Sequence, residues 1–276
     1  MYTHLQPEAK ERPRVTLSTL RESKRKGEKF TSLTAYDASF AARIDMAGVD
    51  VVLVGDSLGM VIQGHDSTVP VTVDDIIYHS KAVARGLRRA MLMVDMPFMS
   101  YTSPDVALEN AIALMQEGGA QVVKLEGNAR QLEVVAHLAS RDIPVCAHLG
   151  LRPQSVHKIG GFRVQGREAQ MGDAMLEDAL SLQDAGADIV LLECVPSELG
   201  KRLTEALDVP VIGIGAGPDV DGQILVLYDI LDITPGRKPR FNQNFMAGST
   251  SVSAALQGYV EAVRTGRYPA PEHCFQ

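Results

Sequence analysis

Four apolar runs that each end in a carboxylate constrain the fold of this chain more than any other feature. They are residues 51–55 before Asp56, 91–94 before Asp95, 121–125 before Glu126 and 189–192 before Glu193. Strands that are apolar on both faces are typical of parallel sheets, because helices cover both faces of such a sheet. The sequence therefore predicts a parallel sheet whose strands carry acids at their carboxyl ends.

Eight candidate strands result when this pattern is followed along the whole chain. The other four apolar runs are residues 30–35, 143–147, 209–214 and 224–230. Helical stretches are expected at residues 38–47, 76–87, 106–116, 129–139, 169–184, 197–207 and 251–264. Eight strands that alternate with helices favour an α/β fold of the (β/α)8 TIM barrel type over the alternative, an open α/β sheet.

Three segments fall outside this repeat. Residues 16–27 predict an extra N-terminal helix that covers the bottom of the barrel. Residues 149–168 form a long, basic, glycine-rich connection, and long loops in a compact domain are usually functional. We expect one domain over residues 1–276, with 1–14 and 268–276 as extended tails.

Composition and charge limit the classes of partner. The chain is 45% hydrophobic and has a net charge of −7, with acids and bases interspersed, which argues against a nucleic-acid partner. No stretch reaches the roughly 18 apolar residues of a membrane span, and the N-terminus lacks the apolar region of a signal peptide. Three cysteines without a disulfide or zinc pattern fit a reducing compartment. We expect a cytoplasmic protein that acts on small molecules.

The acids of three successive strands predict a metal site. Asp56, Asp95 and Glu126 would meet at the carboxyl end of the barrel, where catalytic residues of this fold lie. Neighbouring carboxylates repel each other unless a cation joins them, and oxygen ligands without Cys or His suit Mg²⁺. A single strand-end acid equally often caps the loop that follows it. Three on successive strands favour a shared metal.

Other polar residues at the same end are candidates for catalysis and substrate binding. Lys124 shares a strand face with Glu126, so we expect its partner to be a substrate anion or Glu126 itself. Glu193, on a strand across the barrel, is a candidate general base, with a loop-anchoring role as the alternative. His148 closes the fifth strand, where a structural role is equally compatible, and Ser57 follows Asp56.

A glycine-rich stretch follows the seventh strand. Its sequence is Gly213-Ile214-Gly215-Ala216-Gly217. Glycine loops at this point of a barrel often bind phosphate through backbone N–H groups. Close packing explains such glycines equally well, so both interpretations stay open.

Five short motifs, taken together and in order, resemble one known family. They are Val54-Gly55-Asp56-Ser57-Leu58-Gly59-Met60, Val94-Asp95-Met96-Pro97-Phe98, Lys124-Leu125-Glu126-Gly127, Ala147-His148-Leu149-Gly150-Leu151 and the glycine stretch above. The chain resembles the ketopantoate hydroxymethyltransferase family over about residues 15–265. The resemblance implies a (β/α)8 barrel that assembles as a homo-oligomer, usually a decamer. It also implies hydroxymethyl transfer from 5,10-methylenetetrahydrofolate to 3-methyl-2-oxobutanoate, giving 2-dehydropantoate in pantothenate biosynthesis.

The resemblance also implies roles for single residues. Asp56 and Asp95 look like direct Mg²⁺ ligands that also face the substrate, and Glu126 looks like a ligand that acts through water. The residues that look like contacts to the oxo acid are Ser57, Lys124 and His148. Glu193 looks like the base that removes the C3 proton, while Mg²⁺ stabilises the resulting enolate.

The folate site and two alternative functions remain open at this point. For the folate we identify only the basic residues of the long loop, which equally fit a solvated surface: Arg152, His157, Lys158, Arg163 and Arg167. One alternative function is another Mg²⁺-dependent 2-oxo-acid lyase or mutase, of the phosphoenolpyruvate mutase or isocitrate lyase type. The other is a catalytically silent barrel that acts as a scaffold, which would not need Lys124, Glu126 and Glu193 to face one pocket.

Overall fold

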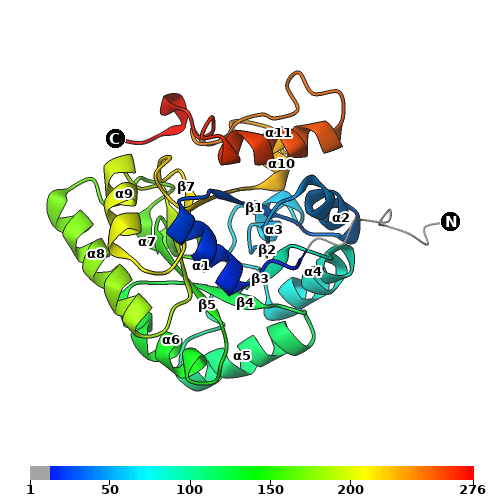
Figure 1. The fold of residues 1–276 in the computed structure, drawn as a ribbon. Helices are drawn as coiled ribbons and strands as arrows, with labels where there is room; N and C mark the ends of the chain where they lie inside the picture. Colours follow the sequence, from blue (N-terminus) through cyan, green and yellow to red (C-terminus); the bar gives the residue numbers. More distant parts are fainter. Residues whose placement is uncertain (1–12) are drawn as a thin grey trace.

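The chain folds into a closed barrel of eight parallel strands in sequential order, surrounded by helices (Figure 1). The computed structural model describes residues 13–276, so most of the predicted tail 1–14 lies outside the described residues. The strands are β1 (Phe30–Thr34), β2 (Val51–Val54), β3 (Met91–Asp95), β4 (Val122–Glu126), β5 (Val145–Gly150), β6 (Ile189–Glu193), β7 (Val211–Ile214) and β8 (Gly222–Leu225). The predicted (β/α)8 barrel is confirmed, and the open sheet is excluded because β1 also pairs with β8.

Helices follow the strands as the sequence predicts. The longer ones are α1 (Leu17–Lys26), α2 (Ala38–Ala47), α4 (Val73–Gly86), α5 (Pro104–Gln116), α6 (Leu132–Ala139), α8 (Ala169–Asp184), α9 (Ser197–Ala206) and α11 (Val252–Arg264). The short ones are α3 (Leu58–Val61), α7 (Val156–Ile159), α10 (Leu227–Ile230) and the 3₁₀ turns η1 (Ala129–Gln131), η2 (Pro153–Ser155) and η3 (Pro271–His273).

Side-chain caps fix where several of these helices begin. Thr72 and Asp75 form a reciprocal capping box at the start of α4. Ser103 accepts the backbone N–H of Val106 at the start of α5, where Pro104 occupies the first turn. These caps satisfy backbone N–H groups in the first turn and so define where α4 and α5 begin.

Two predicted elements differ from the structure. The apolar run 224–230 is not one strand, because β8 ends at Leu225 and the run continues as the helical turn α10. An apolar run alone does not distinguish a buried strand from a buried helical turn. The tail 268–276, expected to be extended, contains the turn η3, and the backbone oxygen of Phe275 accepts the N–H of Ser197.

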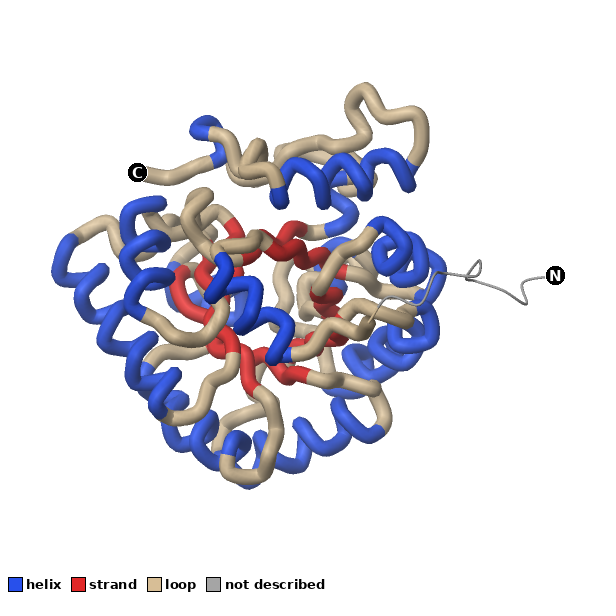
Figure 2. Tube along the Cα trace, in the orientation of Figure 1, coloured by secondary structure: helices blue, strands red, loops and turns tan. Residues whose placement is uncertain are grey.

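The predicted extra helix is α1, and it crosses the opening of the strand ring in Figure 2. The Lys24 ammonium donates to Asp221, just before β8, at 2.9 Å. The Arg21 guanidinium binds Asp188, just before β6, at 2.6 Å. Since both partners precede strands, α1 closes the amino-terminal end of the barrel, opposite the strand-end acids.

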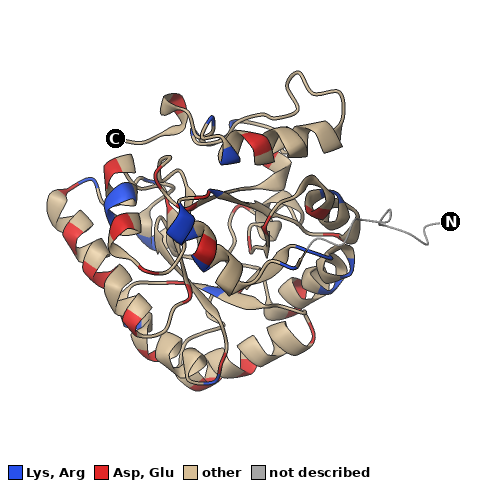
Figure 3. Ribbon diagram, viewed as in Figure 1, with Lys and Arg blue, Asp and Glu red and all other residues tan. Residues whose placement is uncertain are grey.

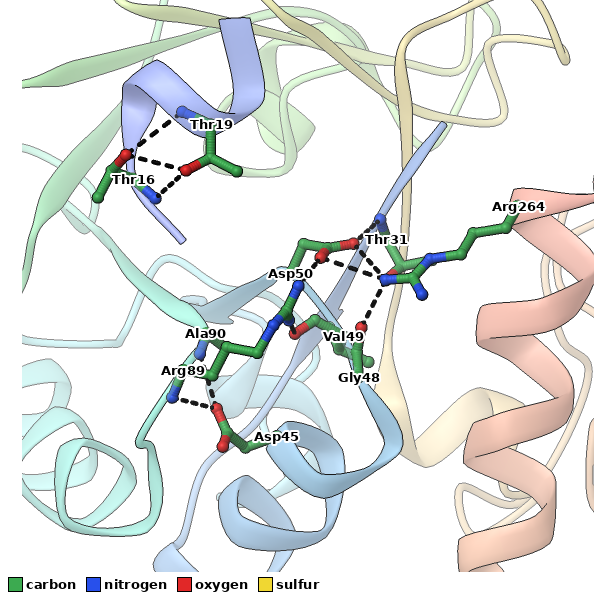
Figure 4. Close-up of polar contacts among 10 residues, drawn as sticks. All are labelled: Thr16, Thr19, Thr31, Asp45, Gly48, Val49, Asp50, Arg89, Ala90 and Arg264. Atoms are coloured by element: carbon green, nitrogen blue, oxygen red, sulfur yellow. Dashed lines mark hydrogen bonds and ion pairs between the residues drawn. The ribbon is translucent and has the colours of Figure 1, made fainter. Parts of the chain in front are cut away.

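An ion network joins several elements at this closed end (Figure 4). Asp50, which is 7% exposed, accepts the backbone N–H of Thr31 and binds the guanidinium groups of Arg89 and Arg264 at 2.5 and 3.2 Å. Asp45 accepts the backbone N–H of Arg89 in the same region. A cavity of about 530 Å³ lies beside this network, away from the strand-end acids. The network therefore serves the fold and lies outside the candidate site.

Charges of both signs occur around the outer helices (Figure 3), as expected from the interspersed sequence. Within residues 13–276, no helix is both long and apolar enough to cross a membrane.

Candidate active site

The strand-end acids of β2 and β3 are in direct contact. Asp56 and Asp95 are only 4% and 2% exposed, and the backbone N–H of Asp56 donates to Asp95 Oδ2 at 2.9 Å. Gly55 makes this approach possible, because a Cβ atom there would lie 3.2 Å from Asp95 Oδ2 and 3.0 Å from Ser57 Oγ. The prediction that these two acids share one site at the carboxyl end of the barrel is therefore supported by their geometry.

Lys124 pairs with Asp95, whereas the sequence suggested a substrate anion or Glu126 as its partner. The register of β3 and β4 places Asp95 directly beside Lys124, so the two side chains enter the barrel at the same level. Glu126 lies two residues further along the same strand, and its carboxylate contacts His148 and the backbone N–H of Gln154. Lys124 and Glu126 are both 4% exposed, and their contacts with Asp95 and His148 place both side chains among the strand-end polar groups.

His148 lies between two acids. Its Nδ1 is 3.6 Å from Glu126 Oε1, and its Nε2 is 3.3 Å from Glu193 Oε2, although neither contact has hydrogen-bond geometry. Strand register explains the arrangement, since His148 is paired with Glu126 and Gly150 is paired with Glu193. Glu193 lies on β6, across the barrel from β2 as expected, and the His148 ring lies between it and Glu126.

Ser57 completes the same end of the barrel beside β2. Its Oγ lies 2.9 Å from the hydroxyl of Tyr36, which follows β1. Burial raises the pKa of Tyr36, so this phenol stays protonated and provides one hydrogen to the pair. Ser57 therefore has a fixed orientation next to Asp56.

Burial and mutual repulsion raise the pKa of most of these acids. The pKa of Asp56 rises to about 7, mainly through burial and then through Asp95, and that of Glu126 rises well above its ordinary value. Burial raises the pKa of Glu193 to about 8. Burial disfavours the charged form of Lys124, but attraction by Asp95, Asp56 and Glu126 outweighs it and raises the pKa of this lysine. Four acids thus lie around one ammonium group, and the pKa values of two of them, Asp56 and Glu193, lie near neutral pH.

His148 is the neutral member of this group. Burial lowers its pKa well below the ordinary value, and the nearby cations Lys124 and Arg152 lower it further. A neutral imidazole carries one N–H and one acceptor nitrogen. His148 can therefore donate to one carboxylate while it accepts a proton from the other neighbour or from a ligand.

Gln154 is a site residue that the sequence did not reveal. This side chain is 5% exposed, and its Nε2 donates to Asp56 Oδ2 at 2.8 Å and to the Met96 carbonyl at 3.0 Å. Its Oε1 accepts from the Tyr101 hydroxyl, and its backbone N–H donates to Glu126 Oε2 at 3.1 Å. A single glutamine in a long loop has no local pattern that marks it. The only signal was the unusual length of the loop.

The remaining candidates of the long loop and the glycine stretch lie outside this cluster of contacts. His157, Lys158, Arg163 and Arg167 are exposed, while Arg152 is half-buried near His148. In the glycine stretch, a Cβ atom at Gly215 would lie 2.8 Å from the Phe241 ring. Gly215 has φ +62°, in the left-handed region that favours glycine. Close packing thus accounts for this glycine without a phosphate.

The donor set fits a divalent cation held by few protein ligands. Within the described residues, no three His, Cys, Asp or Glu side chains are grouped closely enough to enclose a metal ion. Mg²⁺ needs only one or two carboxylates, because water and substrate oxygens complete its octahedral shell. Asp56 and Asp95 are two adjacent buried carboxylates, and a cation would relieve the repulsion that raises the pKa of Asp56. The residues present therefore suit Mg²⁺ in its usual mode of binding.

Comparison with known proteins gives the family. The family model described as ketopantoate hydroxymethyltransferase matches residues 14–271. The chain belongs to the ketopantoate hydroxymethyltransferase family. A 3-methyl-2-oxobutanoate hydroxymethyltransferase of Alkalilimnicola ehrlichii is 60% identical over 275 residues, which cover 100% of this chain and 99% of the relative. The enzyme named 3-methyl-2-oxobutanoate hydroxymethyltransferase 2 of Hahella chejuensis is 58% identical over 95% of this chain and 98% of its own.

Solved structures of more distant proteins share the barrel of this ketopantoate hydroxymethyltransferase family member. Phosphonopyruvate hydrolase aligns with a TM-score of 0.58 at 15% identity, covering 77% of this chain and 80% of its own. A 2,3-dimethylmalate lyase of the PEP mutase/isocitrate lyase superfamily aligns with a TM-score of 0.56 at 15% identity, covering 93% and 92%. At this level of identity the likeness concerns the fold alone.

Proposed function

We propose that this protein transfers a hydroxymethyl group from 5,10-methylenetetrahydrofolate to 3-methyl-2-oxobutanoate and so forms 2-dehydropantoate for pantothenate biosynthesis. Family membership over nearly the whole chain supports the reaction. The observation that carries the mechanism is the arrangement of His148 between Glu126 and Glu193 beside the Asp56–Asp95 pair. Glu193, whose pKa is raised, therefore lies close to the Asp56 and Asp95 carboxylates that suit a cation.

Asp56 and Asp95 would hold Mg²⁺ directly, and Glu126 would reach it through water. Bound there, the ion would supply Lewis-acid stabilisation of the negative charge that develops on the keto oxygen of the oxo acid. Lys124 keeps Asp95 in place through their ion pair and presents positive charge toward the carboxylate of the oxo acid. Ser57 and His148 flank this position and would orient the same substrate.

Glu193 would take the C3 proton of the oxo acid. A carboxylate with an ordinary pKa near 4.5 is a weak base, whereas burial raises the pKa of Glu193 to about 8 and makes it a stronger one. Neutral His148 next to it places no second positive charge beside Lys124, and its low pKa leaves the abstracted proton on Glu193. Water supplies the hydroxyl oxygen: hydrolysis of the methylene bridge releases tetrahydrofolate and a one-carbon unit at the oxidation level of formaldehyde. C3 attacks the carbon of this unit, and the proton held by Glu193 passes to the new alkoxide oxygen, which completes the hydroxymethyl group and restores the Glu193 carboxylate.

The half-buried Arg152 and the exposed basic residues of the loop would bind the folate. Their positive charge suits the carboxylates of the folate glutamate, and the loop begins at the site through Gln154. Family membership further supports a homo-decamer in the cytoplasm. Light scattering coupled to size-exclusion chromatography tests the decamer, and cell fractionation tests the location.

The decisive experiment incubates the purified protein with 3-methyl-2-oxobutanoate, 5,10-methylenetetrahydrofolate and Mg²⁺, and measures 2-dehydropantoate by mass spectrometry. We expect product that requires all three components and that disappears with EDTA and returns with added Mg²⁺. Deuterium exchange at C3 without any folate-dependent product would favour a lyase or mutase of the phosphoenolpyruvate mutase type. Neither product nor exchange from folded, metal-supplied protein would contradict both enzyme functions and favour the scaffold.

A further inference from the structure

Gln154 is buried among groups that mostly accept hydrogen bonds. Two of them, Asp56 Oδ2 and the Met96 carbonyl, receive its Nε2 hydrogens at 2.8 and 3.0 Å. The Tyr101 hydroxyl faces its Oε1, and Glu126 Oε2 receives its backbone N–H at 3.1 Å. One residue thus contacts two of the three candidate metal-site acids at once.

The orientation of this amide is determined by its partners. Asp56 Oδ2 and the Met96 carbonyl are acceptors here, so the NH₂ group must face them. Oε1 then faces Tyr101, whose hydroxyl donates, and burial raises the pKa of that phenol so that it keeps its proton. A glutamate at position 154 would place an acceptor against Asp56 and Met96, so a neutral amide of this length is required.

The segment that carries Gln154 is itself held in place. Gln154 is the central residue of the turn η2, which begins at Pro153 directly after β5 and its short connection. The far end of the loop is held where the backbone N–H of Gln165 donates to the Cys194 carbonyl at 2.9 Å, just after β6. The loop is therefore anchored at both ends to strand ends that carry site residues.

From these contacts we propose that Gln154 is a positioning residue of the metal site, which holds the Asp56 and Glu126 carboxylates in the orientation that binds the cation. This inference rests on the proposed function, because it assigns the role of Gln154 toward the same Mg²⁺ site. Replacement of a residue that hydrogen-bonds to a metal ligand, without touching the metal itself, typically lowers metal affinity or activity by roughly 10–100-fold. The turn Pro153–Ser155, at the start of the long loop, then belongs to the metal site.

The test compares the full-length wild type with Gln154→Met, which keeps the length of the side chain and removes both N–H donors. Electron paramagnetic resonance of free Mn²⁺, used as the probe ion without any substrate, gives the Kd of the site. We expect the Kd to rise about tenfold or more in Gln154→Met. We also expect kcat for deuterium exchange at C3 of the oxo acid to fall at saturating Mn²⁺, because Asp56 is no longer held in orientation.

Gln183→Met is the matched control. Gln183 lies in α8, and its Oε1 accepts the N–H groups of Asp208 and Val209 just before β7, at the opposite end of the barrel. The same substitution there should leave both the Mn²⁺ Kd and the exchange rate within about twofold of wild type. An equal loss in both variants would assign the effect to general destabilisation and overturn the inference.

Tyr101→Phe keeps the inference testable if Gln154→Met does not fold. This change removes only the hydroxyl that fixes the amide, so we expect a rise in the Mn²⁺ Kd that is smaller than in Gln154→Met. If Gln154→Met folds and binds Mn²⁺ as tightly as wild type, the inference is wrong. If only Tyr101→Phe folds, an unchanged Mn²⁺ Kd in that variant contradicts the inference. If the wild-type protein binds no Mn²⁺ and catalyses no deuterium exchange at C3, the proposed function itself is wrong. The role of Gln154 at the metal site is then wrong as well.

Discussion

The Nε2 atom of His148 lies 3.3 Å from the Oε2 atom of Glu193, deep in the carboxyl end of the barrel. The other ring nitrogen faces Glu126 at 3.6 Å. Because burial lowers the pKa of His148 well below its ordinary value, this ring is neutral and has only one hydrogen to share between two acids. His148 therefore lies between the candidate base and the candidate metal-site acid Glu126.

Replacement of His148 tests this connection. His148→Asn should lower kcat for deuterium exchange at C3 by roughly 10–100-fold, because the base loses the neighbour that orients it, while the Kd for Mn²⁺ changes little. Exchange is followed by NMR at saturating Mg²⁺. His137→Asn, on the outer helix α6, is the control and should exchange at the wild-type rate. An exchange rate unchanged in His148→Asn would remove this histidine from the mechanism.

Stability of the metal-free protein should fall as pH rises. The pKa of Glu193 is raised from about 4.5 to about 8 in the folded state, so the folded protein holds this proton more tightly than the unfolded chain. The stabilisation is fully present below about pH 4.5 and is lost as pH rises through about 8. Circular dichroism melts in EDTA at pH 6, 7, 8 and 9 measure it. Glu193→Gln, which does not ionise, should show a flatter dependence, and identical slopes would contradict the assignment.

The ion network at the closed end predicts a stability effect without a catalytic one. Asp50→Ala leaves Arg89 and Arg264 without their shared carboxylate, which should lower the free energy of unfolding by roughly 3–5 kcal/mol. Urea unfolding measures it. Asp173→Ala breaks the exposed pair with Arg202 and should cost less than about 1 kcal/mol. Both folded variants should catalyse deuterium exchange at C3 at the wild-type rate. A large loss of exchange rate in folded Asp50→Ala would show that this end of the barrel takes part in the mechanism.

Features carried by single segments of the chain could be predicted from the sequence. The apolar runs before Asp56, Asp95 and Glu126 fixed the strands, because a strand covered on both faces needs apolar residues throughout. The run 224–230 could not be divided into β8 and α10, since both parts are buried and apolar. The position of the site acids at strand ends followed directly from these runs.

Features that depend on pairing between segments could not be predicted. The partner of Lys124 is Asp95 because β3 and β4 have a particular register, which no local pattern specifies. The contact between His148 and Glu193 likewise depends on the stagger of β5 and β6. Gln154 reaches the site through the path of a loop, so only the three-dimensional structure reveals its role.

The central claim is that Glu193 removes the C3 proton of the oxo acid at a site organised by Asp56 and Asp95. The most direct measurement is deuterium exchange at C3 of 3-methyl-2-oxobutanoate in D₂O with saturating Mg²⁺ and no folate, for wild type and Glu193→Gln. We predict that the wild type exchanges this position, and that the variant binds the oxo acid with similar affinity but exchanges at least about 100-fold more slowly. A Glu193→Gln protein that exchanges C3 at the wild-type rate would contradict the claim and move the base elsewhere.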